Sequence, residues 1–171
     1  MSLSFYTVDD YIRILRENYE KIMIETIDKL ISDEWIASYN YYVGVYTARE
    51  RYDAEIVREL KHHRDEEIKH GDMLGELLHK RFNTGPRRNI EDLVANSNCG
   101  NDPTRSADLL VIAEEQRKGE ICAIKHYKEA ISIAKIVGDA ESAKVFEEIL
   151  NDEIEHRNDL SEFIAKLKGE V

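Results

Sequence analysis

The chain has 171 residues, of which 42% are hydrophobic and 35% are charged, and its formal net charge is -11 at pH 7. This length can bury the core of one domain, and the composition differs from that of disordered chains. The acidic balance and the lack of a basic arm argue against nucleic-acid binding, and no apolar run is long enough to span a membrane. The start of the chain lacks the pattern of a signal peptide. We therefore expect a single cytoplasmic domain over residues 1–171.

The hydrophobic pattern predicts an all-α protein. Apolar positions recur every three or four residues over four long segments, which is typical of helices packed in a bundle. The predicted helices cover about 18–49, 53–82, 104–137 and 139–168. A shorter helical pattern over Val8–Glu17, with Thr7 as its N-cap, is either a separate helix or the start of the first long one, since no helix-breaking residue separates them.

The connections between the predicted helices are short, long and short. The long one, residues 83–103, holds both prolines and several Gly, Asn and Ser residues, with a possible short helix over 90–95. An irregular connection of this length is unusual in a compact domain. It fits a crossover that carries the chain back along a bundle, so we predict an antiparallel four-helix bundle.

The motif Glu-x-x-His occurs four times, and in a glutamate-rich chain its spacing alone selects none of the four. The pairs are Glu59/His62, Glu67/His70, Glu76/His79 and Glu153/His156. At about 100° per residue, only the second and fourth pairs fall on the apolar stripes of their predicted helices. These two pairs are therefore the candidates for a buried site.

The two selected pairs belong to a repeat that spans both halves of the chain. Glu67 and Glu153 each follow another glutamate by 33 residues, and these partners, Glu34 and Glu120, also lie on apolar stripes. The midpoint of each interval falls at or beside a predicted turn, so both glutamates of a pair reach the same height in the bundle. Four glutamates and two histidines are thus predicted to meet inside it.

Six such groups cannot be buried without compensation, because burying unpaired charge costs more free energy than a small core supplies. Cations provide that compensation. Carboxylate and imidazole ligands in this number suit a pair of divalent metal ions, with positions left open for a small oxidant. The alternative is that the helical phase is misjudged and that the six residues are exposed to solvent.

Two tyrosines accompany the repeat. Tyr41 and Tyr127 stand seven residues after Glu34 and Glu120, on the same predicted helix faces. Their phenols either donate hydrogen bonds to ligand carboxylates or simply fill the core.

Three further polar residues lie close to the motifs. Glu66 and Asp152 immediately precede the motif glutamates, where each can accept the second ring N–H of the histidine on the opposite helix. For Glu66, a solvated position is a serious alternative. His63 lies one turn from Glu67 and is either a core histidine or an ancillary metal contact.

Over residues 20–167 the chain resembles the ferritin superfamily. The stretch 59–70, which ends in Glu-Glu-Ile-Lys-His, looks like the second helix of the bacterioferritins. The resemblance implies a di-iron centre in which Glu67 and Glu153 bridge two iron ions, with manganese or zinc as possible occupants. It implies terminal ligands at Glu34, His70, Glu120 and His156, which complete the set of catalytic and metal-ligating residues.

Three departures separate the chain from a true bacterioferritin. Ile68 stands where bacterioferritins carry their haem-ligating methionine, so we expect no haem. Only 15 residues follow His156, too few for the fifth helix of 24-subunit cages. The long connection carries Cys99, and Cys122 follows Glu120 by two residues. In these features the chain resembles the Dps-like ferritins called thioferritins.

The thioferritin resemblance implies a hollow shell of twelve subunits that protects against oxidative stress. Such a shell oxidises Fe(II), preferably with hydrogen peroxide, and stores the Fe(III) mineral. The resemblance also implies that Cys99 and Cys122 lie close together as a redox-active dithiol or disulfide. From the residues alone, two unrelated buried cysteines are equally compatible with the chain.

Three other functions remain open from the sequence. One is a di-iron or di-manganese peroxidase or catalase of rubrerythrin type, although two cysteines cannot build the four-cysteine iron site that rubrerythrins usually add. Another is a DNA-coating structural protein like Dps, which the acidic charge disfavours. The last is a metal-free helical interaction module.

Overall fold

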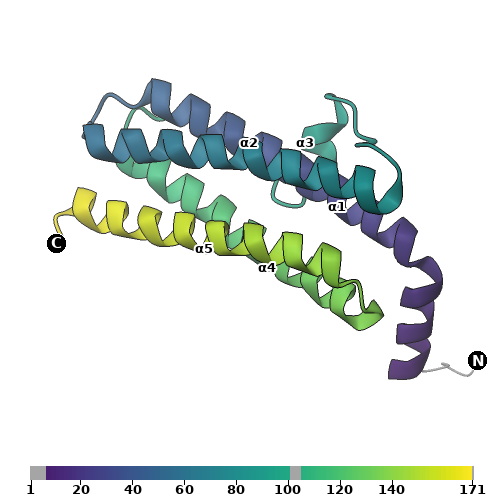
Figure 1. The fold of residues 1–171 in the computed structure, drawn as a ribbon. Coiled ribbons are helices and arrows are strands. Elements are labelled where there is room, and N and C mark those ends of the chain that lie inside the picture. The colour runs from purple at the N-terminus through teal and green to yellow at the C-terminus, as the bar shows by residue number, and fades with distance from the viewer. Residues whose placement is uncertain (1–6, 101–104, 171) are drawn as a thin grey trace, which may run out of the picture.

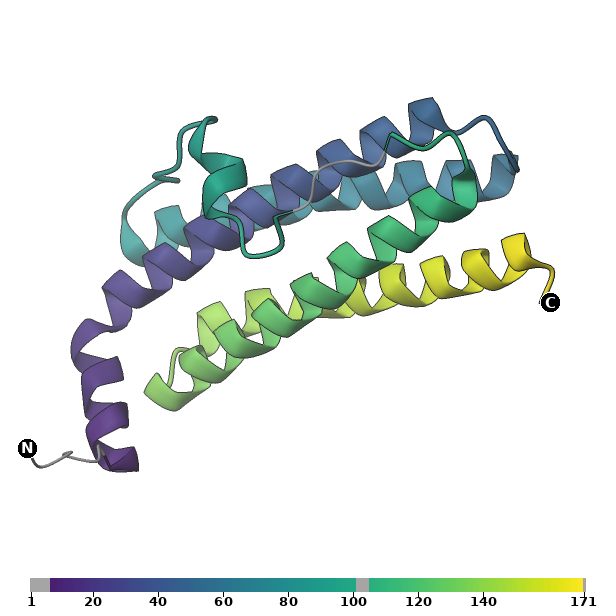
Figure 2. The same cartoon turned by 180° about the vertical axis from the view of Figure 1, so that it is seen from behind.

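The computed structural model describes residues 7–100 and 105–170. Its helices are α1 (Val8–Thr47), α2 (Ala54–Phe82), α3 (Asp92–Asn96), α4 (Leu109–Val137) and α5 (Ala140–Lys168). The four long helices form an antiparallel bundle, with α2 and α5 on the side seen in Figure 1 and α1 and α4 on the side seen in Figure 2. The predicted all-α bundle with a long crossover is confirmed. No helix within the described residues is long and apolar enough to cross a membrane.

Helix α1 is continuous over 40 residues, so the short helix considered over 8–17 is its first part. Thr7 caps it and forms a capping box with Asp10, in which each side chain satisfies a backbone N–H at the helix start. The first turns run at an angle to the rest of α1 in both views (Figures 1 and 2). Tyr19 anchors this part by donating a hydrogen bond to Asp139, the N-cap of α5.

Short polar side chains and left-handed residues set the other helix ends. Asp53 and Asp139 act as N-caps whose carboxylates accept backbone N–H groups of α2 and α5. Asn83 ends α2 and Gly138 ends α4, both with positive φ angles of 50° and 84°. These ends lie close to the boundaries expected from the sequence.

The crossover ends later than predicted, because α4 begins at Leu109 rather than near residue 104. Backbone N–H groups of Arg49 and Glu50 donate to the carbonyl of Ala107, and the Leu109 N–H donates to the carbonyl of Glu50. These bonds hold the chain extended beside the α1–α2 turn, and Asp108 then caps α4. The predicted start at residue 104 itself lies outside the described residues.

A layer of polar residues divides the core into two apolar parts. The part near the α4–α5 turn includes Met23, Ile27, Leu30, Leu74, Leu78, Tyr127 and Phe146. The part near the α1–α2 turn includes Tyr41, Ile56, Leu60, Leu109, Ile112 and Leu160. Between them lie the buried Glu and His residues that the sequence predicted on the apolar stripes.

Candidate metal centre

The four glutamates and two histidines predicted to converge do meet inside the bundle, and each is at most 3% exposed. They form two overlapping groups in which one ligand atom per residue lies within 4.8 Å of the others. The groups are Glu34, Glu67, His70 and Glu153, and Glu67, Glu120, Glu153 and His156. Because Glu67 and Glu153 belong to both, they occupy the positions that bridging ligands would take.

The first group is centred on the Nδ1 atom of His70. This nitrogen lies 3.1 Å from Oε1 of Glu153, 3.3 Å from Oε2 of Glu34 and 3.4 Å from Oε2 of Glu67. Three helices thus direct oxygen atoms at one imidazole nitrogen. The second group is more open, with Nδ1 of His156 at 3.3 Å from Oε1 of Glu67 and 4.0 Å from Oε2 of Glu153.

The other nitrogen of each histidine contacts an acid on the opposite helix. Nε2 of His70 lies 3.2 Å from Oδ2 of Asp152, and Nε2 of His156 lies 3.0 Å from Oε2 of Glu66. These are the contacts expected from the sequence. Such a contact keeps a proton on Nε2, so Nδ1, which faces the centre, can bind a metal once the metal displaces its own proton.

The two tyrosines are fully buried and make hydrogen bonds across the bundle. Tyr41 on α1 donates to Oε1 of Glu120 on α4, while Tyr127 on α4 donates to Oε1 of Glu34 on α1. Each phenol therefore holds the glutamate of the other helix. Burial and the facing carboxylate raise the pKa of both phenols, so they remain protonated donors.

The centre contains more acidic than basic side chains, four glutamates against two histidines. Burial and the neighbouring Glu67 raise the pKa of Glu153 to about 7 and that of Glu120 well above its usual value. Burial alone would lower the pKa of His156, but the carboxylate of Glu67 raises it to about 11. The metal-free site therefore keeps protons bound, and these balance part of the negative charge that metal cations would otherwise balance.

The residues fit a dinuclear metal centre. Among the described residues, Oε1 of Glu67, both carboxylate oxygens of Glu153 and Nδ1 of His156 are buried and form no hydrogen bond of good geometry, although ligand atoms of the centre lie 3.1–4.0 Å away. Buried polar atoms are normally paired, so these atoms are available as ligands. Four carboxylates balance the charge of two divalent ions, and the mixture of oxygen and nitrogen ligands suits iron, manganese or zinc.

A ferritin-like domain family matches residues 24–169 of the chain. The chain belongs to the ferritin-like family. No curated protein matches it in sequence.

Solved structures show how this ferritin-like chain compares with its relatives. A dodecameric thioferritin, the bacterioferritin-related protein of Bacteroides fragilis, has a TM-score of 0.81 and 23% identity over 94% of this chain and 95% of that one. Dps from Thermosynechococcus elongatus has a TM-score of 0.76 and 17% identity, covering 88% and 94% of the two chains. Desulfovibrio desulfuricans bacterioferritin has a TM-score of 0.75 and 21% identity, covering 90% and 84%. At such identities the likeness shows the fold.

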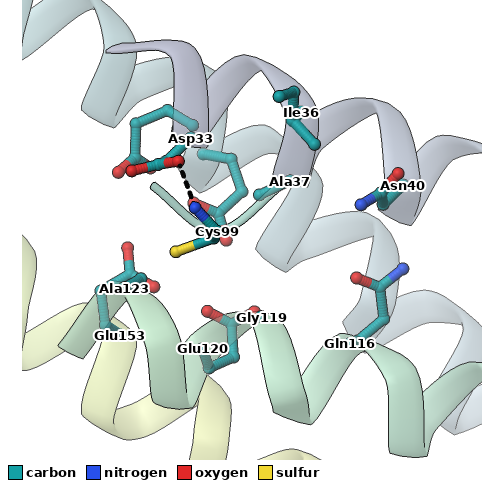
Figure 3. Close-up of a pocket in the computed structure, with 12 residues that line it drawn as sticks. Asp33, Ile36, Ala37, Asn40, Cys99, Gln116, Gly119, Glu120, Ala123 and Glu153 are labelled. Carbon is teal, nitrogen blue, oxygen red and sulfur yellow. Dashed lines mark hydrogen bonds between the residues drawn. The ribbon is translucent and has the colours of Figure 1, made fainter. Parts of the chain in front are cut away.

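A narrow cavity of about 30 Å³ leads to the ferritin-like centre from the side formed by α1 and α4. Its lining includes Glu34, Glu67, Glu120 and Glu153, together with Cys99, Asn40 and Gln116. Figure 3 labels the last five of these residues. This volume is about the space that one water molecule takes in the liquid. Only a very small molecule can therefore reach the carboxylates by this route.

A disulfide joins Cys99 in the crossover to Cys122 on α4, at the rim of the cavity. Asp33 holds the same loop, because its buried carboxylate accepts hydrogen bonds from the backbone N–H groups of Asn98 and Cys99. Figure 3 shows the bond to Cys99. The sequence did not indicate this role for Asp33. Its position next to Glu34, at the edge of an apolar stripe, was the available signal.

His63 is buried but belongs to neither group of the centre. Its ring stacks on that of His156, with centroids 4.2 Å apart, and its Nε2 lies 3.3 Å from Oδ2 of Asp159. Burial, together with the nearby His156, lowers the pKa of His63 to about 3, so the ring is neutral at physiological pH. The other two Glu-x-x-His pairs end in exposed histidines, His62 and His79.

Proposed function

We propose that this ferritin-like protein oxidises Fe(II) as its substrate at the buried centre and stores the Fe(III) product in a hollow cage. Hydrogen peroxide is the preferred oxidant, and oxygen is the alternative. The observation that carries the proposal is the pair of overlapping ligand groups, which share Glu67 and Glu153 and contain buried atoms that form no hydrogen bond of good geometry among the described residues. In this reading Glu67 and Glu153 bridge two irons. The terminal ligands are Glu34, His70, Glu120 and His156.

Two adjacent Fe(II) ions suit the chemistry of peroxide. Each Fe(II) loses one electron, while hydrogen peroxide takes up two electrons and two protons, its O–O bond breaks, and two water molecules form. Supplying both electrons at one centre avoids the one-electron cleavage that releases hydroxyl radical. The 30 Å³ cavity is compatible with peroxide and with oxygen, because both are small molecules little larger than water.

The surrounding residues prepare the ligands before iron arrives. Tyr127 and Tyr41 each fix one oxygen of Glu34 and Glu120, and the other oxygen of Glu34 faces Nδ1 of His70 in the centre. Asp152 and Glu66 orient the histidine rings through their outer nitrogens. A preorganised ligand set binds metal more tightly, because less conformational entropy is lost on binding.

We also propose that the protein assembles into a shell of twelve subunits. The thioferritin of Bacteroides fragilis is a dodecamer, and this chain covers 95% of that one. Exposed aromatic side chains on α1 support assembly, since a row of this kind on the surface marks a contact with another protein. The row comprises Trp35, Tyr39, Tyr42 and Tyr46.

The test compares the wild-type protein with a Glu67→Ala/Glu153→Ala variant. Anaerobic titration should show two Fe(II) ions bound per subunit in the wild type at the centre and none there in the variant. Stopped-flow mixing with peroxide should show that fast Fe(II) oxidation is lost as well. The matched control is Glu76→Ala/His79→Ala, which removes an exposed Glu-x-x-His pair on the same helix and should change neither result.

Two outcomes would count against the proposal. Unchanged binding and oxidation in the Glu67→Ala/Glu153→Ala variant would place the reaction elsewhere. Turnover of peroxide without an electron-dense mineral core after repeated iron additions would instead favour a peroxidase of rubrerythrin type. Electron microscopy of iron-loaded protein, combined with native mass, distinguishes these cases.

A further inference from the structure

A third group of possible metal ligands lies outside the centre, between α2 and α5. Glu59 and His63 are one helical turn apart on α2, and Asp159 extends from α5. One ligand atom from each residue lies within 4.8 Å of the other two. Two carboxylates and an imidazole from two helices therefore converge on one point.

The state of His63 distinguishes this group from a patch of surface acids. The residue is 1% exposed, and among the described residues its Nδ1 atom has no hydrogen-bond partner. Its other nitrogen, Nε2, contacts only a carboxylate, that of Asp159. A structural histidine in a core normally has both nitrogens satisfied. His63 instead leaves Nδ1 unpaired among the described residues and directs Nε2 at Asp159, inside the group.

The charge around the group favours a cation. The depression beside it is lined by Glu55, Arg58, Glu155, Glu162 and Lys166, among others. Lys166 is already engaged, at 2.9 Å from Asp53. With Glu59 and Asp159 themselves, five carboxylates line the depression against two cationic side chains, Arg58 and Lys166.

The group lies next to the centre, on the side of the bundle formed by α2 and α5. His63 stacks on His156, so the two sites are separated by one layer of imidazole rings. The cavity that leads to the carboxylates opens between α1 and α4, whereas this group lies between α2 and α5, on the opposite side of the bundle (Figures 1 and 2). A small molecule and a metal ion can thus use different faces of the same centre.

We propose that Glu59, His63 and Asp159 form a third site for a divalent cation, through which iron passes between the buried centre and the α2–α5 face. Two oxygens and one nitrogen are ligands that Fe(II), Co(II) and Zn(II) all accept. Three protein ligands leave coordination positions open, which suits a site of passage better than one of permanent binding. The transfer of iron rests on the proposed function, but the binding of the cation does not.

The test uses Co(II) as the probe with the assembled, metal-free protein. Crystals soaked in Co(II) and measured at the cobalt absorption edge should show three anomalous peaks per subunit, one of them between Glu59, His63 and Asp159. Equilibrium dialysis should give three bound ions per subunit. Asp159→Asn or Glu59→Gln should remove the third ion alone, since both side chains are partly exposed and tolerate the change. Glu162→Gln removes a charge from the same depression and should leave all three ions bound.

The outcomes separate this proposal from the previous one. Loss of two ions in Glu67→Ala/Glu153→Ala, with the third peak retained, supports the third site independently of the centre. The third site is refuted if wild-type crystals show no peak there, or if Glu162→Gln weakens the third ion as much as Asp159→Asn does. For the role in transfer, Asp159→Asn should slow mineral growth while the first two irons are still oxidised at the wild-type rate. Equal mineral growth in both proteins would overturn that role.

Discussion

Tyr127 on α4 donates a hydrogen bond to Glu34 on α1, although the two residues are 93 positions apart in the chain. Tyr41 on α1 makes the equivalent bond to Glu120 on α4. The two halves of the chain therefore exchange tyrosines, so that each half orients a glutamate of the other. This exchange links the bundle's stability to the geometry of its metal centre.

Tyr127→Phe should lower both the stability of the bundle and the metal affinity of the centre. The change leaves a buried carboxylate oxygen of Glu34 without its donor, which costs about 1–3 kcal/mol of stability. Losing a residue that orients a metal ligand typically lowers metal affinity about 10- to 100-fold. Thermal unfolding of the metal-free protein and Co(II) titration measure the two effects. Tyr52→Phe, at an exposed tyrosine of the α1–α2 turn, is the control, and equal behaviour of the two variants would contradict the role of Tyr127.

Glu66→Gln should lower metal affinity without unfolding the bundle. The carboxylate of Glu66 contacts Nε2 of His156 from a half-buried position, so its loss affects the orientation and basicity of that imidazole. We expect a roughly 10- to 100-fold loss of affinity for one of the two ions at the centre. Glu155→Gln, an exposed position on α5, provides the comparison. Identical Co(II) isotherms for the two variants would show that Glu66 is only solvated.

The metal-free centre should lose stability as pH rises. The pKa of Glu153 is 4.5 in an unfolded chain and about 7 in the folded protein, so the folded state binds the proton more tightly. The stability that this proton contributes is present below pH 4.5 and is lost as pH rises through 7. Glu153→Gln mimics the protonated form. The metal-free variant should therefore unfold at a higher temperature than the wild type above pH 7, and the two unfolding temperatures should converge near pH 4.5. A difference in unfolding temperature that does not change with pH would refute this explanation.

Removing the disulfide should destabilise the region around the crossover. Cys99 and Cys122 close a loop of 23 residues, for which the entropic effect on the unfolded chain is about 3 kcal/mol. Cys99→Ser/Cys122→Ser should unfold at lower temperature than the oxidised wild type. A dithiol reductant should bring the wild type down to the level of the variant. If reductant lowers the unfolding temperature of both proteins equally, the disulfide is not the cause.

Two glycines offer opposite outcomes for the same substitution. A Cβ atom at Gly44 would lie 2.7 Å from Cγ2 of Ile112, so Gly44→Ala should push α1 from α4 and cost about 1–3 kcal/mol. At Gly75, in the interior of α2, no heavy atom lies within 4 Å of that position within the described residues. Gly75→Ala should therefore stabilise the protein by up to about 1 kcal/mol through helix propensity. Chemical denaturation of both variants checks the signs.

The six buried Glu and His residues were predictable because their selection depends on local helical geometry. An apolar stripe requires only the angle between residues on one helix, and this angle is the same in every α-helix. Glu67 and Glu153 stood out from the other Glu-x-x-His pairs by this criterion. The equal heights of Glu34 and Glu67 followed as well, because a short turn between antiparallel helices fixes which residues face each other.

Contacts that depend on the placement of the crossover and on the rotation of helices about one another needed the tertiary structure. Asp33 and Cys99 are 66 positions apart in the sequence, and no periodicity links an irregular segment to a helix face. Only the folded chain shows that Asp33 holds the loop that carries Cys99. It also shows that Tyr127 donates to Glu34 rather than to the glutamate of its own helix. The contact between His63 and Asp159 likewise became visible only in the structure. Local periodicity determines which side chains are buried. Packing between helices decides which of them meet.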